Sequence, residues 1–489
     1  MGEEPAFGAL LKRYRLAAGL THEALAERAA LSGRAISDLE RGVSRAPRAE
    51  TLALLVQALP LAPQERAALA AAGRRTALQD AWRPPHNLPI QLTSFIGRER
   101  ELRVAADLLR RPDVRLLTVT GAGGTGKTRL AIELAMAALG AFPAGVCFVT
   151  LAPVSGADLV IRAIARALGA GDAEGRTSPA NLVELLDDRG CLLVLDNFEQ
   201  LLAAAPIVVD LLRACPGVKI LATSRAPLRV SGEHVFPIQP LPLPVLTDRA
   251  PVDELARNPA IRLFVDRATS VRPDFALTPD NASAVVAICV RLDGLPLALE
   301  LAAARVRALP PPALVARLVD TTGSTSLDLL TGGARDLPRR QQTLRDTIAW
   351  SYELLPPAEQ LLFRSLAVFA GGCTVEAVEA VCQPATSEEQ VLNMVVGLAS
   401  LVDNSLLQQG EGPDGEPRFL MLETIRSFAM ERLSAHAEEA VLRHAHARYF
   451  LALLEATGAL LFAGSPKRLR YAAEQDNVQA ALRWLVTQG

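Results

Sequence analysis

The octapeptide Gly121-Ala122-Gly123-Gly124-Thr125-Gly126-Lys127-Thr128 follows an apolar run, Val114 to Thr120, and precedes a helical pattern, Arg129 to Leu139. Its spacing, G-x-x-x-x-G-K-[ST] between a strand and a helix, is that of a phosphate-binding loop. Glycines let backbone N–H groups surround an anion, a lysine adds positive charge, and a threonine hydroxyl can bind Mg²⁺. An ordinary glycine-rich turn would not require both flanking elements. We therefore expect ATP or ADP to contact Gly121, Gly123, Gly124, Thr125, Gly126, Lys127, Thr128 and Arg129.

Apolar runs alternate with helical stretches around this loop, at 114–120, 146–151, 191–196, 218–223 and 234–238. Such runs, separated by helices, indicate a parallel sheet that helices cover on both faces. The third run delivers Asp196 to the carboxyl edge of the sheet, where Asp196 and Thr128 are the expected Mg²⁺ ligands. The fourth run is followed by Arg225, which we expect to contact the γ-phosphate.

The composition limits the classes of protein that the chain can be. Its 489 residues suffice for roughly three domains that each bury a core. The net charge of −2 excludes a protein that nucleic acid coats along its whole length, so any DNA contact must be local. The 6 cysteines form no C-x-x-C pair, and neither a signal peptide nor a membrane-spanning apolar run is found. We therefore expect free thiols, no membrane contact and a cytoplasmic location.

Short helices are expected over residues 1–78. The first has one buried face, made by Phe7, Leu10, Leu11 and Tyr14. Thr21 and Ser32 are the expected N-caps of the second and third helices, and a fifth helix is expected to begin at Pro63 and end at Gly73. Because a short turn joins the second and third helices, the pattern predicts a helix-turn-helix with its third helix facing outward.

Two segments of this region carry a resemblance to a known DNA-binding family. Leu20-Thr21-His22-Glu23-Ala24-Leu25-Ala26, followed by Leu31-Ser32-Gly33-Arg34-Ala35-Ile36-Ser37-Asp38-Leu39-Glu40-Arg41-Gly42, resembles the Cro/C1 (XRE-type) repressor helix-turn-helix. The resemblance implies a buried ion pair between Arg15 and Glu40. It also places His22 where the family usually has a glutamine against a phosphate. Gly33 has no side chain, so one of the reading positions is silent.

The side chains of the third helix suggest how DNA would be contacted. Arg34 can bind guanine through two hydrogen bonds, Asp38 can accept from cytosine, and the flanking arginines suit phosphates. We expect DNA contacts from Thr21, His22, Ser32, Arg34, Ser37, Asp38, Arg41 and Arg45. The alternative is a helical protein-interaction module whose arginines are only solvated.

Residues 79–94 contain three prolines without periodicity, in Trp82-Arg83-Pro84-Pro85-His86-Asn87-Leu88-Pro89, and are expected to form a stiff, extended linker. The motifs beyond it resemble those of the STAND class of P-loop NTPases, specifically the NB-ARC-like core of bacterial regulators. Gly294-Leu295-Pro296-Leu297-Ala298-Leu299 matches the G-x-P element of that class, which implies that Pro296 packs on the adenine. Phe95-Ile96-Gly97-Arg98 matches the segment that frames the base from the other side, which implicates Ile96 and Gly97. Segments 342–352, 362–369, 401–407 and 419–425 resemble its winged-helix domain.

The sequence departs from that family pattern at two positions. Asn197 follows Asp196 where an acid would orient the hydrolytic water, so the general base is missing there. The nearby Glu199 cannot be placed from the sequence. Leu422 stands where many relatives carry a histidine that senses the diphosphate, and a leucine cannot donate a hydrogen bond. We therefore expect the chain to hydrolyse ATP slowly at most. We also expect a contact other than that of the missing histidine to stabilise the inactive state.

We expect a multidomain protein with an all-α helix-turn-helix domain over 1–78, a proline-rich linker over 79–94, an α/β P-loop domain with a parallel sheet over 95–240, a helical subdomain over 241–335, a winged-helix domain over 336–433 and the start of a helical, tetratricopeptide-like (TPR) region over 434–489. A single helical pair cannot bury its own faces, so we expect the chain to stop before a sensor region that would meet an inducer or protein partner. His444 and His446 lack ligand partners at metal-binding spacing and are expected on the surface.

Together these features favour an ATP- or ADP-binding, signal-transducing switch with a DNA-binding head, a transcriptional regulator in which nucleotide state controls domain packing and self-association. Two alternatives stay open at this stage. The head could instead recruit a protein effector in a defence or stress NTPase, or the chain could be a working ATPase.

Overall fold

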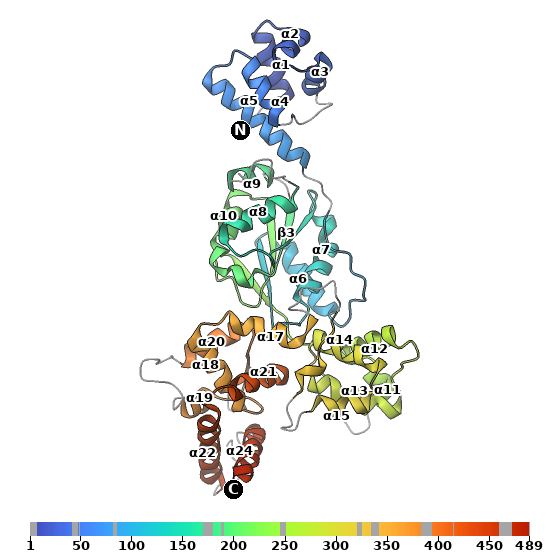
Figure 1. Cartoon of the computed structure of the whole chain (residues 1–489), viewed down its shortest axis with the longest axis vertical. Helices are drawn as coiled ribbons and strands as arrows, with labels where there is room; N and C mark the ends of the chain where they lie inside the picture. Colours follow the sequence, from blue (N-terminus) through green and yellow to red (C-terminus); the bar gives the residue numbers. More distant parts are fainter. Residues whose placement is uncertain are drawn as a thin grey trace.

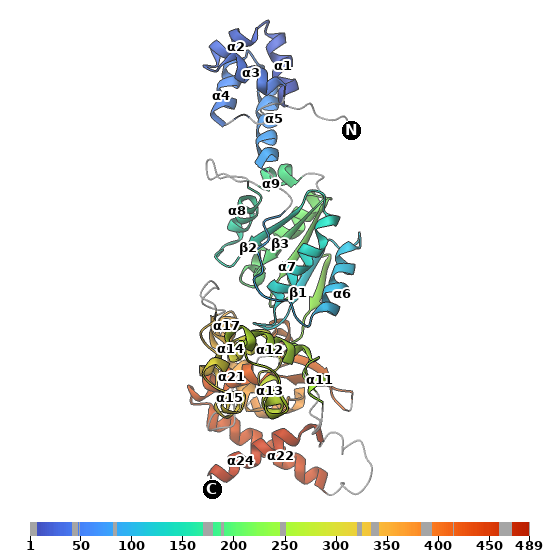
Figure 2. The same cartoon turned by 90° about the vertical axis from the view of Figure 1, so that its right-hand side faces the viewer.

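The computed structural model describes residues 7–41, 47, 49–81, 86–169, 179–186, 190–244, 251–319, 325–333, 342–382, 394–413, 415–458 and 472–488. A small helical head lies at one end of the molecule, an α/β domain in the middle, and two helical lobes at the other end (Figures 1 and 2). This order matches the multidomain architecture that the sequence predicts. No described helix is long and apolar enough to cross a membrane.

The head is a bundle of five short helices. They are α1 (Phe7–Ala17), α2 (His22–Arg28), α3 (Gly33–Glu40), α4 (Ala49–Ala58) and α5 (Pro63–Ala81). The predicted N-caps are confirmed, because Thr21 Oγ1 accepts from the N–H of Ala24 and Ser32 Oγ from that of Ala35, both at 3.1 Å. The apolar faces of the helices meet in one core that includes Leu11, Leu25, Ile36, Leu55 and Leu69.

The prediction that Gly73 ends the fifth helix is wrong, since α5 continues to Ala81. A Cβ atom at Gly73 would lie 2.5 Å from Cδ1 of Leu52, so the glycine permits the close approach of α4 to α5. The expected linker boundary at 79 consequently falls within the helix. Helix α5, which is longer than expected, packs against α9 (Pro179–Leu186) of the α/β domain (Figure 2).

The middle domain has a five-stranded parallel sheet in the order β2-β3-β4-β1-β5. Its strands are β1 (Leu116–Thr120), β2 (Val146–Thr150), β3 (Cys191–Asp196), β4 (Val218–Thr223) and β5 (Glu233–Pro237). The neighbouring helices are α6 (Glu99–Arg110), α7 (Lys127–Ala138), α8 (Ala157–Ala167) and α10 (Ala205–Ala214). Two separate apolar clusters fill the two faces of the sheet, as expected for parallel strands covered on both sides.

The second half of the predicted linker contacts the sheet. His86 forms a parallel bridge with Val146 of β2, and Asn87 donates to the carbonyl oxygen of Phe148 at 2.9 Å while accepting from its N–H at 2.5 Å. The segment after residue 85 therefore lies along the outer edge of the sheet.

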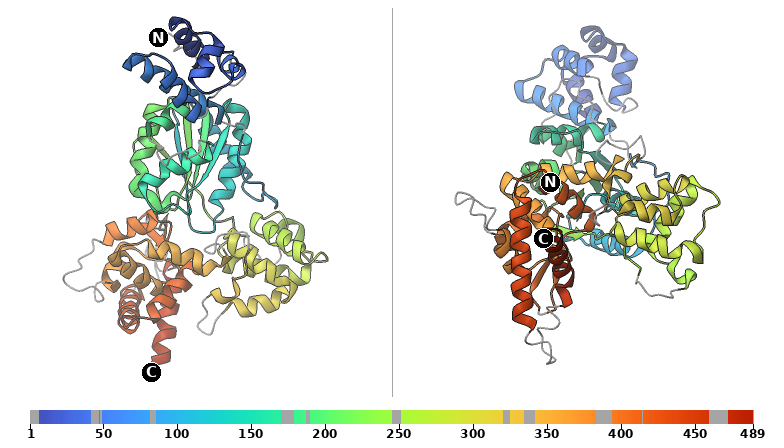
Figure 3. Two further views of the ribbon diagram at one scale, coloured as in Figure 1. Left: turned by 45° about the horizontal axis from the view of Figure 1, so that its top comes forward. Right: turned by 60° about the horizontal axis from the view of Figure 1, so that its bottom comes forward.

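The two lobes follow the sheet in the chain. The helical subdomain comprises α11 (Val252–Leu255), α12 (Pro259–Val271), α13 (Pro279–Arg291), α14 (Pro296–Ala304) and α15 (Pro311–Leu318). The winged-helix lobe comprises α17 (Leu344–Glu353), α18 (Pro357–Ser365), α19 (Val375–Cys382), α20 (Met394–Asp403), β6 (Gln408–Glu411), β7 (Pro417–Leu420) and α21 (Glu423–Ser434). The last two described helices are α22 (Glu439–Gly458) and α24 (Gln475–Gln488), and Figure 3 shows the sheet between the head and these lobes.

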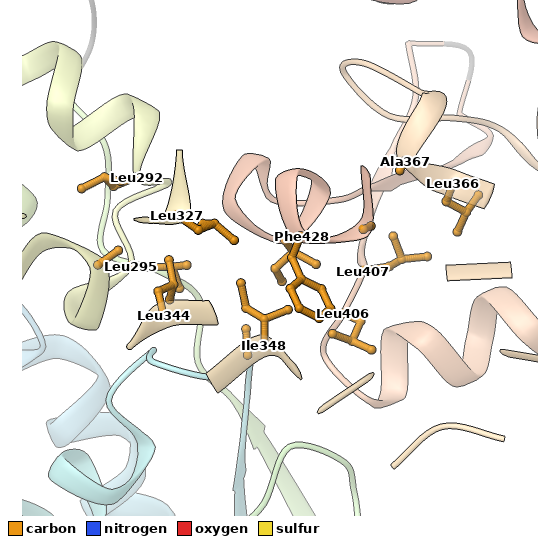
Figure 4. Packing of buried hydrophobic residues seen from close by; sticks show 14 of the residues in the cluster. Leu292, Leu295, Leu327, Leu344, Ile348, Leu366, Ala367, Leu406, Leu407 and Phe428 are labelled. Carbon is orange, nitrogen blue, oxygen red and sulfur yellow. The ribbon is translucent and has the colours of Figure 1, made fainter. Parts of the chain in front are cut away.

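A single apolar core joins the two lobes. Leu292 and Leu295 from the helical subdomain face Leu344 and Ile348 of α17, and Phe428 of α21 packs in the same cluster (Figure 4). This cluster is separate from the two cores of the sheet. The lobes therefore form one packed body beside the sheet.

The expectation that His446 lies on the surface is wrong. Its side chain is buried, packs against Phe369 and Phe450, and lies 3.4 Å from Oδ1 of Asn477, and burial lowers its pKa to about 4. Among the described residues no group of three or more His, Cys, Asp or Glu side chains could hold a metal. His446 is thus part of the contact between the winged-helix lobe and the last helices.

Candidate nucleotide-binding site

The glycine-rich loop connects β1 to α7 in backbone conformations that favour glycine. Gly124 and Gly126 have φ of +83° and +94°, and α7 begins at Lys127. Lys127 Nζ donates to the carbonyl oxygens of Gly121 and Ala122 at 2.7 and 3.0 Å. The lysine charge is therefore folded over the loop, at the N-terminus of a helix, where an anion would be stabilised.

Thr128 and Asp196, the predicted Mg²⁺ ligands, lie in direct contact. Thr128 Oγ1 donates to Oδ1 of Asp196 at 2.6 Å, and Thr223 Oγ1 donates to the same oxygen at 2.7 Å. Burial raises the pKa of Asp196, although both hydroxyl donors oppose that shift. A hydroxyl and a carboxylate on adjoining elements are oxygen donors of the kind that Mg²⁺ prefers, so these residues fit the ion.

Elements from the helical subdomain and the segment before α6 frame the loop. The N–H of Leu297 donates to the carbonyl oxygen of Gly124 at 3.2 Å, which places Pro296, the first residue of α14, beside the loop. Ile96 is partly buried, and a Cβ atom at Gly97 would lie 2.5 Å from Cβ of Pro259. The structure thus brings Ile96, Gly97 and Pro296 to the same side of the sheet as the loop.

Arg98 is a site residue that the sequence reasoning did not select. Its guanidinium is buried and donates to the carbonyl oxygens of Thr125 at 2.9 Å and Gln239 at 2.6 Å. It therefore ties the segment before α6 to the phosphate loop. The sequence shows that an arginine directly follows the Ile-Gly pair, but it does not show that this side chain points inward.

Arg129 was expected to contact the nucleotide, but its described contacts go to the linker. It donates to Oε1 of Gln91 at 2.5 Å and to the carbonyl oxygen of Thr93, and it lies 3.3 Å from Glu133. The side chain thus connects the first turn of α7 to the segment that leads back toward the head.

Arg225 links the edge of the sheet to the winged-helix lobe. Its Nε lies 3.3 Å from Oε1 of Glu199, and its Nη1 donates to the carbonyl oxygen of Thr347 in α17 at 2.8 Å. Thr347 also approaches the loop, because a Cβ atom at Gly123 would lie 2.6 Å from its Cγ2 atom. The carbonyl oxygen of Arg225 accepts from Ser405 at 2.6 Å. The predicted γ-phosphate sensor is therefore bonded to the lobe in this conformation.

Asp293 is a second residue that the sequence reasoning missed. Its carboxylate accepts from the N–H groups of Glu423 and Thr424 at 3.0 and 2.9 Å and from the hydroxyl of Thr424 at 2.8 Å. Burial raises the pKa of Asp293 to about 6. Because Leu422, the N-cap of α21, has no capping side chain, the aspartate of another lobe caps this helix.

Of the predicted DNA contacts of the head, Thr21, Ser32, Arg34 and Arg41 are exposed, and His22, Ser37 and Asp38 are partly buried. The Arg34 side chain is 91% exposed, whereas Asp38 is bonded to Arg41 at 2.7 Å and lies 3.9 Å from Arg34. The predicted ion pair is confirmed, with Arg15 Nε 2.6 Å from Oε1 of Glu40, and His22 also contacts Glu40, at 3.0 Å. Arg45 lies outside the described residues. Arg34 is thus the most exposed base-reading candidate, held only by a long ion pair with Asp38.

Three family descriptions match separate parts of the chain. "Helix-turn-helix domain" matches residues 6–69, "AAA domain" matches 111–232, and "Winged helix-turn-helix domain" matches 355–434. These matches agree with the head, the sheet domain and the winged-helix lobe, and an AAA domain implies that the chain binds a nucleotide.

Among solved structures, a STAND protein with a tetratricopeptide repeat sensor from Pyrococcus horikoshii has a TM-score of 0.28 and 17% identity, covering 82% of this chain and 54% of that one. The Aeropyrum pernix ORC2 protein has a TM-score of 0.39 and 15% identity, covering 73% of this chain and 98% of that one.

Similar proteins are found in Mycobacterium and Streptomyces species. The "Putative HTH-type transcriptional regulator Rv0890c" of Mycobacterium tuberculosis is 42% identical over 373 residues, which are 76% of this chain and 40% of that protein. The chain thus spans about two fifths of the length of that relative. "Regulatory protein AfsR" of Streptomyces coelicolor is 30% identical and matches 66% of this chain and 31% of that protein. "Uncharacterized protein Rv0894" of M. tuberculosis is 39% identical over 73% of this chain and 86% of that protein. The chain therefore belongs to the family of this mycobacterial protein, and it joins a helix-turn-helix domain, a P-loop ATPase domain and a winged helix in one polypeptide.

Proposed function

We propose that the chain is a nucleotide-controlled transcriptional regulator, in which ATP and ADP set the packing of the lobes on the sheet and thereby its self-association on DNA. The bond from Arg225 to Thr347 carries this proposal. It joins Arg225, the residue expected to contact the γ-phosphate, to the first helix of the winged-helix lobe. A nucleotide can shift such an equilibrium only through contacts that differ between the two packings.

The sheet and the lobes meet through apolar packing, with Ala122 of the loop in the core of the lobes, and through polar contacts for which a phosphate can compete. The polar contacts include Arg225 with Thr347, Ser405 with the carbonyl oxygen of Arg225, and Arg229 with Asp403. A hydrogen bond from a charged donor contributes about 1.5 to 3 kcal/mol, which corresponds to a shift of roughly 10- to 150-fold in the equilibrium. If the γ-phosphate attracts Arg225 away from Thr347, ATP therefore favours release of the lobes and ADP does not.

Asp293 provides the contact that holds the lobes together without a diphosphate-sensing histidine. Its three hydrogen bonds to the first turn of α21 do not depend on a ligand. Since the lobes also share an apolar core, we infer that they move as one body against the sheet.

The position of the head supports an indirect effect of the nucleotide on DNA binding. The head contacts the sheet domain through α9, on the side away from the two lobes (Figures 1 and 2). Self-association of released chains would place several heads on one DNA and raise affinity through avidity. Mg²⁺, held by Thr128 and Asp196, would neutralise phosphate charge.

Replacing Lys127 by alanine should abolish nucleotide binding and leave the fold intact, because the lost charge serves the ligand and not a core. Mass spectrometry of nucleotide released from the denatured protein measures the stoichiometry, and circular dichroism checks the fold. Lys12→Ala, which changes an exposed lysine of α1, is the control and should keep wild-type nucleotide content. Wild-type nucleotide content in Lys127→Ala would contradict the assignment.

Replacing Arg34 by alanine should weaken binding by about 1 to 3 kcal/mol at one base pair of the preferred site and relax the preference there. Arg41→Ala should instead weaken all sequences alike and lower the salt slope by about 1, as expected for a phosphate contact. Fluorescence anisotropy with a set of single-base variants, at two or more salt concentrations, separates these outcomes. An equal loss on every sequence for Arg34→Ala would identify it as a phosphate contact only.

The switch itself is tested by light scattering with ADP and with a non-hydrolysable ATP analogue. The analogue, but not ADP, should increase the molar mass of the wild type, and Arg225→Ala should bind both nucleotides yet lose this difference. Arg229→Ala is the matched control, because it removes a largely exposed contact to Asp403 across the same interface without changing Arg225, and it should keep the mass difference between the two nucleotides. Equal masses in both nucleotide states of the wild type, or a normal response in Arg225→Ala, would refute the mechanism.

Replacing Asp293 by alanine should destabilise the first turn of α21, because three hydrogen-bond donors there lose their acceptor. Amide hydrogen exchange at residues 423–426 should accelerate about 10-fold or more. Asp280→Ala, an exposed aspartate in the first turn of α13, is the control and should leave α21 protected. Unchanged exchange in Asp293→Ala would show that the cap does not stabilise the helix.

A further inference from the structure

Glu199 lies in the site because the chain turns sharply after β3. Asn197 has φ of +67°, in the left-handed region that is uncommon for a residue other than glycine, and its N–H donates to Thr223 Oγ1 at 2.9 Å. A short 3-10 segment, Phe198–Ala204, begins directly after it. This turn places the Glu199 side chain, only 4% exposed, beside Asn197 and Arg225.

The two carboxylate oxygens of Glu199 have different surroundings. Oε1 accepts from Asn197 Nδ2 at 3.0 Å and lies 3.3 Å from Arg225 Nε. Oε2 is buried and has no hydrogen-bond partner among the described residues. Buried acceptors are almost always satisfied by protein or by water, so this oxygen is suited to a water molecule.

The charge of Glu199 fits this arrangement. Burial alone would raise its pKa, but the positive charges of Arg225 and Lys127 outweigh burial and hold the pKa below the usual value. The carboxylate is therefore ionised at neutral pH and can accept a proton. The carboxamide of Asn197, which occupies the usual position of the base, cannot.

We propose that Glu199 is the general base of ATP hydrolysis in this chain, displaced two positions along the sequence by the left-handed Asn197. This inference rests on the nucleotide site proposed above. Oε2 accepts a proton from a water molecule whose oxygen forms a bond to the γ-phosphorus. The bond between the γ-phosphorus and the β,γ-bridging oxygen breaks, its electron pair leaves with ADP, and Glu199 returns the proton to solvent.

A purely structural role is the competing explanation, in which Glu199 only holds Arg225 in place. That role accounts for Oε1 but gives no function to the buried Oε2. Glutamine preserves the size of the side chain and an acceptor for Arg225, but it cannot take a proton. Glu199→Gln therefore separates the two explanations.

The test is single-turnover hydrolysis of ATP by the full chain with Mg²⁺, with nucleotide binding measured in parallel. Glu199→Gln should keep wild-type nucleotide binding and the ATP-dependent mass increase, yet lower the hydrolysis rate about 100-fold or more. The acid limb of the wild-type rate profile against pH should disappear in this variant. Adding Asn197→Asp to Glu199→Gln should restore part of the rate, because it returns a carboxylate to the usual position.

Each other result overturns the proposal. A wild-type rate in Glu199→Gln, or no hydrolysis by the wild type above the buffer background, excludes Glu199 as the base. Loss of the ATP-dependent mass increase at an unchanged rate assigns it to the holding of Arg225 alone. Failure of the nucleotide site itself is recognised separately, because the wild type would then bind no more nucleotide than Lys127→Ala.

Discussion

Parallel strands end at one edge of their sheet, and this constraint gathers the polar chemistry of the molecule in one place. Asp196 ends β3, Thr223 ends β4, and the glycine-rich loop follows β1 between its two neighbours. These residues are far apart in the sequence, yet Thr128 and Thr223 both donate to the same oxygen of Asp196. Below that edge the strands are apolar, and both faces of the sheet must be covered. The polar residues therefore have few other places in the sheet than its edge.

Hydrogen bonds continue from this edge into the winged-helix lobe. Asn197 donates to Thr223 through its backbone and to Glu199 through its side chain, and Arg225 contacts both Glu199 and Thr347. Neighbouring links share groups, since Asn197, Glu199 and Arg225 each make two of these contacts, so a change of partner at one end affects the next group. Arg225 is the member that can exchange a protein acceptor for a phosphate. From its single position, the Arg225 side chain therefore both contacts the lobe and lies close to the loop.

Much of this arrangement could be predicted from local patterns. The strands, the phosphate loop, the caps at Thr21 and Ser32, and the ion pair of Arg15 with Glu40 follow from periodicity, turn chemistry and family resemblance. The prediction that Gly73 ends a helix was wrong because this glycine instead permits the close packing of α4. The local sequence around Gly73 does not reveal that contact. Arg129 and His446 depended on partners distant in the chain. Asp293 was missed and Glu199 could not be placed, because their contacts with α21 and with Arg225 are tertiary.

Leu422 and Asp293 have complementary effects on the first turn of α21. A helix N-terminus has unpaired N–H groups, and a leucine at the N-cap cannot satisfy them. Asp293, on the loop just before Gly294 and Pro296, supplies the missing acceptors from the other lobe. The same loop reaches the phosphate loop, because Leu297 donates to Gly124. In the switch proposed above, a movement of the phosphate loop would therefore reach the cap of α21 through a few residues.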